Sequence, residues 1–266
     1  MVCMVVLWWL QPEATVNDFE ILSETSGYVE VRHARGTGRF YKEFLFGFDG
    51  EFETWFGEGK WTTMALLSPS AKTVQDYHAL RTKIFAGEAD FADNRIEAMD
   101  GAAKFSAVAP TEDMVTSKSM LENNQLWFVN GDDLWFRAKY HLESGTPYTL
   151  VDFQERGRTG SPGPRVTIDD GKFLGIELKH GLKPRLRQDQ VRVPLGEWFE
   201  LKVHLRLDHQ SGHAHLWQDG ILLIDGPIQT LPEKDSLLNA LEVGITATSE
   251  AAVLLMDDVV ISHGEL

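Results

Sequence analysis

The sequence predicts an all-β fold, a sandwich of two antiparallel sheets, and three observations support this prediction. Twelve short segments alternate between apolar and polar residues or form brief apolar runs. Turn-forming residues are abundant, with 23 glycines and 10 prolines in 266 residues. Helical periodicity is scarce, and the best short helical candidate is 236–240. Short strands with few helices between them pack as two antiparallel sheets. The expected strands are 28–33, 77–85, 126–129, 134–142, 148–153, 165–168, 173–178, 198–207, 213–218, 221–224, 240–246 and 253–262.

Alternation is clearest between Leu201 and Leu207, where every second residue is leucine or valine. Lys202, His204 and Arg206 occupy the positions between them. Successive side chains of a strand point to opposite faces, so the apolar set faces a core and the polar set faces outward.

A hairpin turn is predicted at Asp219-Gly220, between the apolar-patterned segments 213–218 and 221–224. Aspartate followed by glycine tolerates positive φ at both central positions of a two-residue turn. We therefore expect 201–207 and 213–217 to be adjacent antiparallel strands, followed by this hairpin.

The chain divides into an N-terminal extension, 1–48, and a sandwich domain, 49–266, with the extension pairing onto a sheet edge. Residues 2–10 form an apolar run that is similar to a signal-peptide core but lacks a positive flank. This run favours a secreted or periplasmic protein; a buried strand or a misassigned start is the alternative. The single cysteine, Cys3, excludes an intrachain disulfide.

Charge narrows the range of partners. The net charge of −15 argues against nucleic-acid and anionic-membrane binding, and no apolar run is long enough to span a membrane. Residues 156–206, however, hold 11 Lys and Arg against 6 Asp and Glu. This basic segment is either a solvated face or a surface that meets an anionic ligand.

From about residue 50 onward a series of segments follows in order: Glu51-Phe52-Glu53 with Trp61, His78-Ala79-Leu80-Arg81 as a first core strand, Asn94-Arg95-Ile96-Glu97, Asp133-Leu134-Trp135-Phe136-Arg137, Gly196-Glu197-Trp198, Leu216-Trp217-Gln218-Asp219-Gly220 and Met256-Asp257-Asp258-Val259. Together they resemble the segments of the concanavalin A-like jelly-roll polysaccharide lyases, the heparin-lyase-like and alginate-lyase-like enzymes. The resemblance implies a concanavalin-like jelly roll that engages polysaccharide and cleaves an anionic, uronate-containing glycan by β-elimination, without a cofactor for the chemistry and as a monomer.

The chain departs from that pattern where such lyases often carry catalytic residues. The strand 148–154 has Asp152 and Gln154 where Gln and His are usual, and the late strand 242–246 has no tyrosine. These departures leave a non-catalytic carbohydrate-binding module, or a sandwich without a sugar site, as alternatives to the lyase.

A uronate lyase must neutralise the substrate carboxylate, remove the acidic proton and protonate the leaving oxygen. The resemblance assigns the first task to Arg95, with Arg81 second. Gln154 would donate a hydrogen bond, and Asp152 would contact substrate from the same strand face. The candidates for proton transfer, each also explicable as a packed or rim residue, are Tyr148, Tyr140, His141 and His180.

A glycoside hydrolase is the weaker enzymatic reading. The stretch Thr149-Leu150-Val151-Asp152-Phe153-Gln154-Glu155 resembles a catalytic Glu-x-Asp-x-x-Glu strand whose first carboxylate is replaced by Leu150. Asp152 and Glu155 point to opposite faces of an unbulged strand, and they form a catalytic pair only if a bulge brings them to one face.

The sequence also predicts a calcium site. Glu53 and Asp257 meet if the terminal strands pair, and carboxylate oxygens suit calcium. No spacing of histidine and cysteine indicates zinc.

Overall fold

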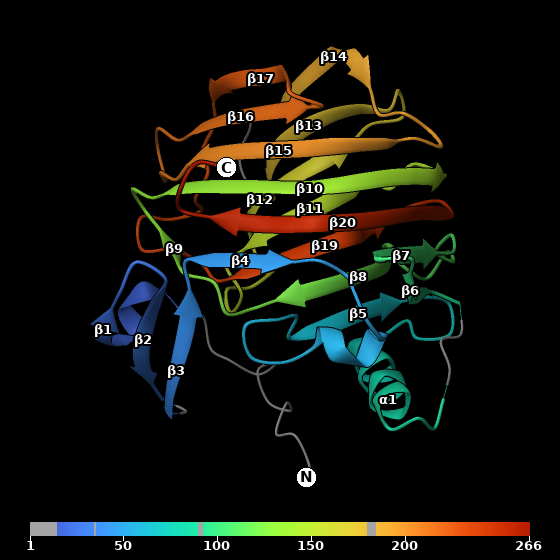
Figure 1. Ribbon diagram of the computed structural model, residues 1–266, viewed down its shortest axis with the longest axis horizontal. Helices are drawn as coiled ribbons and strands as arrows, with labels where there is room; N and C mark the ends of the chain where they lie inside the picture. The colour runs from blue at the N-terminus through green and yellow to red at the C-terminus, as the bar shows by residue number, and fades with distance from the viewer. Residues whose placement is uncertain (1–14, 35, 90–92, 180–184) are drawn as a thin grey trace.

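The computed structural model describes residues 15–34, 36–89, 93–179 and 185–266, and it confirms the two-layer antiparallel sandwich. Figure 1 shows one sheet in front of the other. The eight-stranded sheet runs, in spatial order, β17 (Ile221–Pro227), β16 (His213–Gln218), β15 (Trp198–Arg206), β10 (Asp133–Ser144), β20 (Ala252–Ser262), β7 (Ala102–Ala107) and β6 (Arg95–Met99), with β4 (Glu43–Phe46) also paired to β20. The seven-stranded sheet runs β14 (Leu186–Arg192), β13 (Phe173–Lys179), β12 (Gly163–Ile168), β11 (Thr149–Gln154), β19 (Ala240–Thr248), β8 (Ser117–Asn123) and β5 (Thr63–Leu67).

The core lies between these sheets and follows the alternation of side chains. In the seven-stranded sheet, one cross-strand row of apolar residues is buried in it, namely Met64, Leu121, Val243, Val151, Val166 and Ile176. The residues one position along each strand therefore face away from the core, on the outer face of this sheet.

The expected hairpin is confirmed. β15 pairs antiparallel with β16, and β16 pairs antiparallel with β17. Asp219 and Gly220 join β16 to β17 with φ values of 51° and 76°, as a turn with two left-handed residues requires.

Two predicted elements are wrong. Residues 77–85, expected as a strand, belong to the helix α1 (Val74–Phe85). Thr73 caps this helix by accepting a hydrogen bond from the backbone of Asp76, whose carboxylate accepts one in return from Thr73, so a local capping box decides the segment's structure. Residues 236–240, expected as a helix, form β18 (Leu237–Leu238) and the start of β19.

The N-terminal extension contributes to the sandwich as well as to a sheet of its own. β4 pairs with β20 beyond the part of β20 that pairs with β7, and Phe44 and Phe48 are buried in the main core. The smaller sheet covers a second cluster that includes Phe40 and Trp127. The remaining elements are β1 (Glu20–Glu24), β2 (Tyr28–His33), β3 (Gly36–Tyr41), β9 (Phe128–Val129) and the short 3-10 turns η2 (Val16–Asp18) and η3 (Phe52–Trp55).

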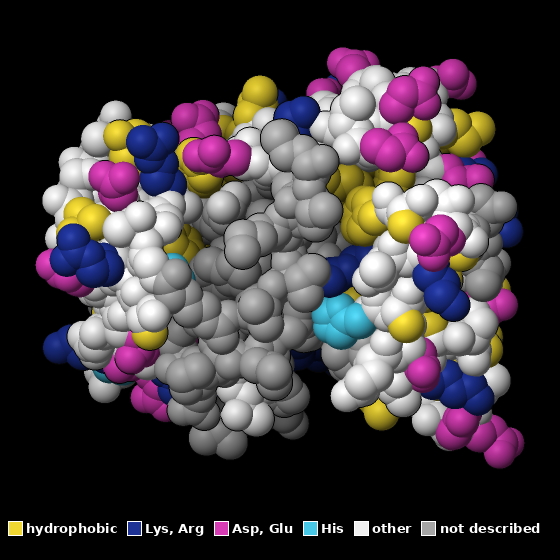
Figure 2. Space-filling model, turned by 90° about the horizontal axis from the view of Figure 1, so that it is seen from below, with side chains coloured by type: hydrophobic (Ala, Val, Ile, Leu, Met, Phe, Trp, Pro, Cys, Tyr) yellow, Lys and Arg dark blue, Asp and Glu magenta, His cyan; other side chains and the backbone are white. Residues whose placement is uncertain are grey.

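Across the described ranges, no helix is long and apolar enough to cross a membrane. Figure 2 shows the molecule from below, with Asp and Glu side chains spread over the described parts of this face and Lys and Arg among them.

A substitution of Phe153 tests which face of β11 packs into the core. Its ring is buried in the core, edge-on to Phe136. We expect Phe153→Ala to lower the free energy of unfolding by about 3–5 kcal/mol, because it removes core contacts and leaves a cavity. Urea denaturation measures the change. Arg187→Ala, an exposed change on β14 of the same sheet, is the control and should stay within about 0.5 kcal/mol of the parent; similar losses in the two variants would contradict the assignment.

Candidate functional site

A row of polar side chains crosses the outer face of the seven-stranded sheet. Cross-strand pairing joins its members directly from β5 to β13, and we call them the polar row: Thr63, Glu122, Glu242, Asp152, Arg165 and Glu177. The three central carboxyl groups are buried, with exposures of 1% for Glu122, 2% for Glu242 and 3% for Asp152. Buried carboxyl groups are costly unless they are paired, so this face is a candidate functional site.

Asp152 and Glu242 are direct neighbours across β11 and β19, and their environments push their pKa values in opposite directions. Burial and the adjacent charge of Glu242 raise the pKa of Asp152. Burial opposes ionisation of Glu242 too, but the charges of Lys118, Arg156 and Lys179 outweigh it and lower the pKa of Glu242. The pKa values of the two neighbouring carboxyl groups are therefore pushed apart, as in the acid and base pairs of catalytic sites.

Glu122 and Glu242 are held together by cations. The guanidinium of Arg156 donates from Nε to Glu122 Oε1 at 3.0 Å, from Nη2 to Glu122 Oε2, and lies 3.5 Å from Glu242 Oε1. Lys118 Nζ lies 3.6 Å from Glu242 Oε2. Arg156 comes two residues after the last residue of β11, so this contact also holds the end of the strand that carries Asp152.

Gln154 lies two residues after Asp152 on the same face, with 1% exposure. Within the described part of the chain, neither its amide nitrogen nor its oxygen has a hydrogen-bond partner, and Asp152 Oδ1 also has none. Unsatisfied buried polar groups are rare because each costs about 1–3 kcal/mol. These atoms are therefore suited to bind a ligand.

Lys179 completes the neighbourhood of Asp152. Lys179 pairs with Gly163 of β12. Gly163 lies against the backbone of Phe153 and Gln154. A β-carbon on residue 163 would come within 1.8 Å of the Phe153 carbonyl oxygen. Glycine thus permits the close approach of β12, and it places no side chain between Gln154 and Lys179. Burial lowers the pKa of Lys179, although Asp152 acts in the opposite direction.

Tyr148 joins the row at its β13 end. Its hydroxyl donates to Glu177 Oε1 at 2.8 Å, and Arg165 and Arg185 both lie over its ring. Burial and the hydrogen bond to Glu177 raise the pKa of Tyr148, so it remains protonated at neutral pH. The side chains of Arg165, Glu177 and Arg185 keep exposures of 16–19%. The face is therefore more open at this end than at Glu122.

Arg81 joins the row at the other end. The helix α1 brings it to β5, where Arg81 Nη1 donates to Thr63 Oγ1 at 2.5 Å. Tyr77 of the same helix is buried beneath the Arg81 guanidinium, 5.5 Å from the ring centroid. The mistaken strand prediction thus still led to a residue of this face.

Basic side chains outnumber carboxyl groups here, in a chain whose net charge is −15. Four carboxyl groups, those of the polar row, are accompanied by six basic side chains, namely Arg81, Lys118, Arg156, Arg165, Lys179 and Arg185. The local balance suits an anionic ligand.

The structure brings four of the sequence-predicted site residues to this face and places others elsewhere. Asp152, Gln154, Tyr148 and Arg81 are on it. Arg95 is not: it lies in β6 of the other sheet, half exposed and 3.9 Å from Glu97, so the core separates it from β11. His141 is also on the other sheet, in β10 beside Trp198, and Tyr140 is buried in the core. His180 lies outside the described residues.

The Glu155 carboxylate is separated from Asp152, as expected for opposite strand faces. It accepts a hydrogen bond from Ser236 at 2.7 Å and pairs with Arg158. The carboxyl group beside Asp152 is instead Glu242 of β19.

The expected calcium ligands stay a prediction. Glu53 is exposed in η3, and Asp257 is in β20. Burial raises the pKa of Asp257, although backbone hydrogen bonds from Asp258 and Phe48 act against this. These two carboxylates would supply part of the six to eight oxygens that calcium takes, and backbone carbonyls would have to supply the rest.

Sequence reasoning missed Glu122, Glu242, Arg156, Lys118 and Lys179. The alternation Lys118-Ser119-Met120-Leu121-Glu122 was a usable signal, since it places Lys118 and Glu122 on one strand face. Only the register between β8, β19 and β11 shows that this face is shared with Asp152.

Comparison with known proteins identifies the fold. No protein-family model and no curated protein sequence matches the chain. The solved structure of an endo-β-1,4-glucuronan lyase from the fungus Trichoderma reesei superposes with a TM-score of 0.52 at 14% identity, covering 65% of this chain and 89% of that one. Alginate lyase A1-II′, a member of polysaccharide lyase family-7, gives 0.51 at 13%, with 76% and 94% covered. The cellulose induced protein Cip1 gives 0.51 at 14%, with 81% and 97% covered. The chain has the concanavalin-like jelly-roll fold that these proteins share.

Proposed function

We propose that the outer face of the seven-stranded sheet binds an anionic, uronate-containing polysaccharide and cleaves it by β-elimination. The observation that carries this proposal is the group formed by Asp152, Gln154 and Lys179: a carboxyl group of raised pKa, an amide without a hydrogen-bond partner in the described part of the chain, and a lysine of lowered pKa on one sheet face. The excess of cations there supports an anionic substrate, and the shared fold with two uronate lyases is consistent with it.

Each residue has a task in this reaction. The amide of Gln154 and the guanidinium of Arg165 donate to the uronate carboxylate, which makes the neighbouring carbon-bound hydrogen more acidic. Neutral Lys179 removes that hydrogen as a proton. The electron pair left behind forms the carbon–carbon double bond as the glycosidic carbon–oxygen bond breaks, and Asp152 protonates the departing oxygen.

Burial shifts the pKa values of Lys179 and Asp152 toward the neutral forms that these tasks need. Two ionised partners would have to be desolvated together, whereas an amine and a carboxylic acid are both neutral. The raised pKa of Asp152 and the lowered pKa of Lys179 follow from this preference. Tyr148, protonated and held by Glu177, offers a hydroxyl to a neighbouring sugar at the more open end.

Glycoside hydrolysis is the second candidate, and the Asp152–Glu242 pair favours it. The two side chains are direct cross-strand neighbours with pKa values pushed apart, which is the arrangement of a general acid beside a nucleophile. Glu242 is engaged by Lys118 and Arg156, which reduces its nucleophilicity and favours elimination over hydrolysis.

Product analysis on uronate polymers tests the proposal. We expect ultraviolet-absorbing unsaturated ends from glucuronan or alginate and none from a neutral glucan. Lys179→Met should reduce kcat by about 10²–10⁴-fold, the usual contribution of a general base. Gln154→Ala should lower kcat/KM by about 5–150-fold, equivalent to about 1–3 kcal/mol for a lost contact in a desolvated site.

Lys139→Met is the matched control, because Lys139 is half exposed on the other sheet and pairs with Asp258. It should leave kcat unchanged. New reducing ends without ultraviolet absorbance would support hydrolysis instead, and tight binding of the polymer without any product would leave a carbohydrate-binding module.

The pH profile of kcat checks the assignment of acid and base. The rate should rise with pH until Lys179 is neutral, and fall once Asp152 loses its proton. Because the pKa of Lys179 is lowered and that of Asp152 raised, the active window should lie between the ordinary values of aspartate and lysine. Asp152→Asn should remove the alkaline limb from the residual activity; an unchanged profile would exclude Asp152 as the acid.

Calcium at Glu53 and Asp257 is a separate structural proposal. If the ion joins η3 to β20, the calcium-selective chelator EGTA should lower the melting temperature. Asp257→Ala should melt at the lowered temperature with or without EGTA, and Asp258→Ala should keep the sensitivity. A parent melting curve that EGTA does not change rejects the site.

A further inference from the structure

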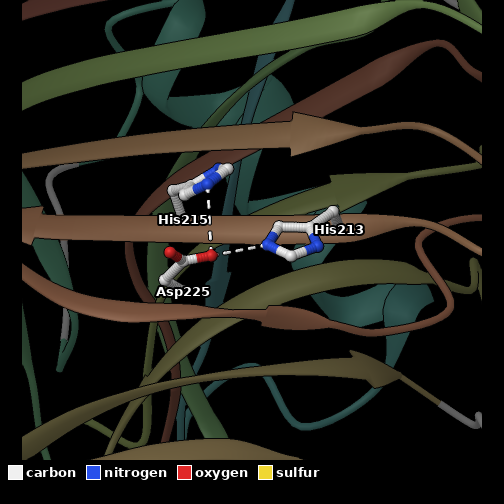
Figure 3. Close-up of side chains that lie close together, drawn as sticks. All are labelled: His213, His215 and Asp225. Atoms are coloured by element: carbon white, nitrogen blue, oxygen red, sulfur yellow. Dashed lines mark hydrogen bonds and ion pairs between the residues drawn. The ribbon is translucent and has the colours of Figure 1, made fainter.

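Histidine side chains gather on the outer face of the eight-stranded sheet, on the opposite side of the molecule from the polar row. His213 and His215 are two residues apart in β16, so both point to this face. Asp225 of the edge strand β17 pairs directly with His215. Figure 3 shows the two imidazoles converging on the Asp225 carboxylate. Among the described residues, these three form the group of close nitrogen and oxygen ligands.

The distances suit a single small cation. Asp225 Oδ1 lies 2.7 Å from His213 Nε2 and 3.3 Å from His215 Nε2, and all three ligand atoms lie within 4.8 Å of one another. Ligands about 2.0–2.1 Å from a tetrahedral zinc are about 3.3 Å apart. Small rotations of the partly exposed side chains, 26% for His215 and 37% for His213, close the remaining difference.

A second shell orients His215. Its Nδ1 lies 3.1 Å from His204 Nδ1, and His204 Nε2 lies 2.8 Å from Asp133 Oδ1. One set of tautomers satisfies both contacts: His204 donates from Nε2 to Asp133 and accepts at Nδ1 from His215. This leaves the Nε2 lone pair of His215 directed at the cation. A carboxylate behind a metal-bound histidine is the usual way to fix its tautomer.

We propose that His213, His215 and Asp225 bind a divalent transition-metal ion, with zinc as the physiological class, and that His204 and Asp133 position the ligand His215. Two imidazoles and one carboxylate select zinc or copper over calcium and magnesium, which prefer all-oxygen sites. Water completes the coordination, because Asp225 and His213 are open to solvent. The ion joins β16 to the edge strand β17.

Zinc titration of the full chain, without a histidine tag, tests the site. Calorimetry should show one zinc per chain, and zinc should raise the melting temperature. Cobalt should give the strong visible bands of a tetrahedral site, while calcium and magnesium give no binding at the same concentrations. His213→Ala, His215→Ala and Asp225→Asn should each remove the one-to-one phase. His204→Ala should weaken zinc binding by about 10–100-fold without changing the stoichiometry, as expected for a positioning residue.

His209→Ala is the matched control, since His209 is a partly exposed histidine bound to Asn130 rather than to this group. It should bind zinc like the parent. The proposal is overturned if the parent binds no zinc at one per chain, if the three ligand variants keep that phase, or if His209→Ala loses it. Circular dichroism of each variant separates loss of a ligand from loss of the fold.

Discussion

The register between β11 and β19 is the constraint on which the candidate site depends. It sets Asp152 opposite Glu242, and the next pairing sets Glu242 opposite Glu122. A shift of β11 by one residue would turn Asp152 into the core and expose Val151 on the outer face, away from Glu242. The apolar core therefore fixes the site, because the packing of one face determines which side chains meet on the other.

Buried charge on that face explains the position of the cations. Glu122 and Glu242 would repel each other if they were both ionised without partners. Arg156 contacts both, and Lys118 contacts Glu242. These cations lower the pKa of Glu242, whereas burial still raises the pKa of Glu122. Asp152 and Gln154 have buried polar atoms without a hydrogen-bond partner in the described part of the chain, and the pKa values of Asp152 and Lys179 are shifted. These three residues lie together toward the more open end.

The fold was more predictable from sequence than the site. Alternation in 201–207 and the Asp219-Gly220 turn are local signals, and both predicted the structure correctly. The strand predicted for 77–85 was wrong because one capping interaction, between Thr73 and Asp76, outweighed a strand-like pattern. Asp152 and Gln154 were found because they share one strand, whereas Glu242 and Lys179 reach them across strand pairings that no local pattern encodes. The pair His213-x-His215 is visible in the sequence, but the third member of the proposed metal site, Asp225, lies on another strand and only the β16–β17 pairing brings it there.

Leu150 shows how the chain differs from a single-strand carboxylate motif. It is buried in the core together with Val151, and the pairing of β11 is irregular between Thr149 and Val151. A bulge of this kind lets two consecutive side chains face the same side. A carboxylate at position 150 would therefore point into the core and could not act beside Asp152. The second carboxyl group has to come from a neighbouring strand, and Glu242 supplies it from β19, where the cations of β8 and of the segment after β11 control its charge.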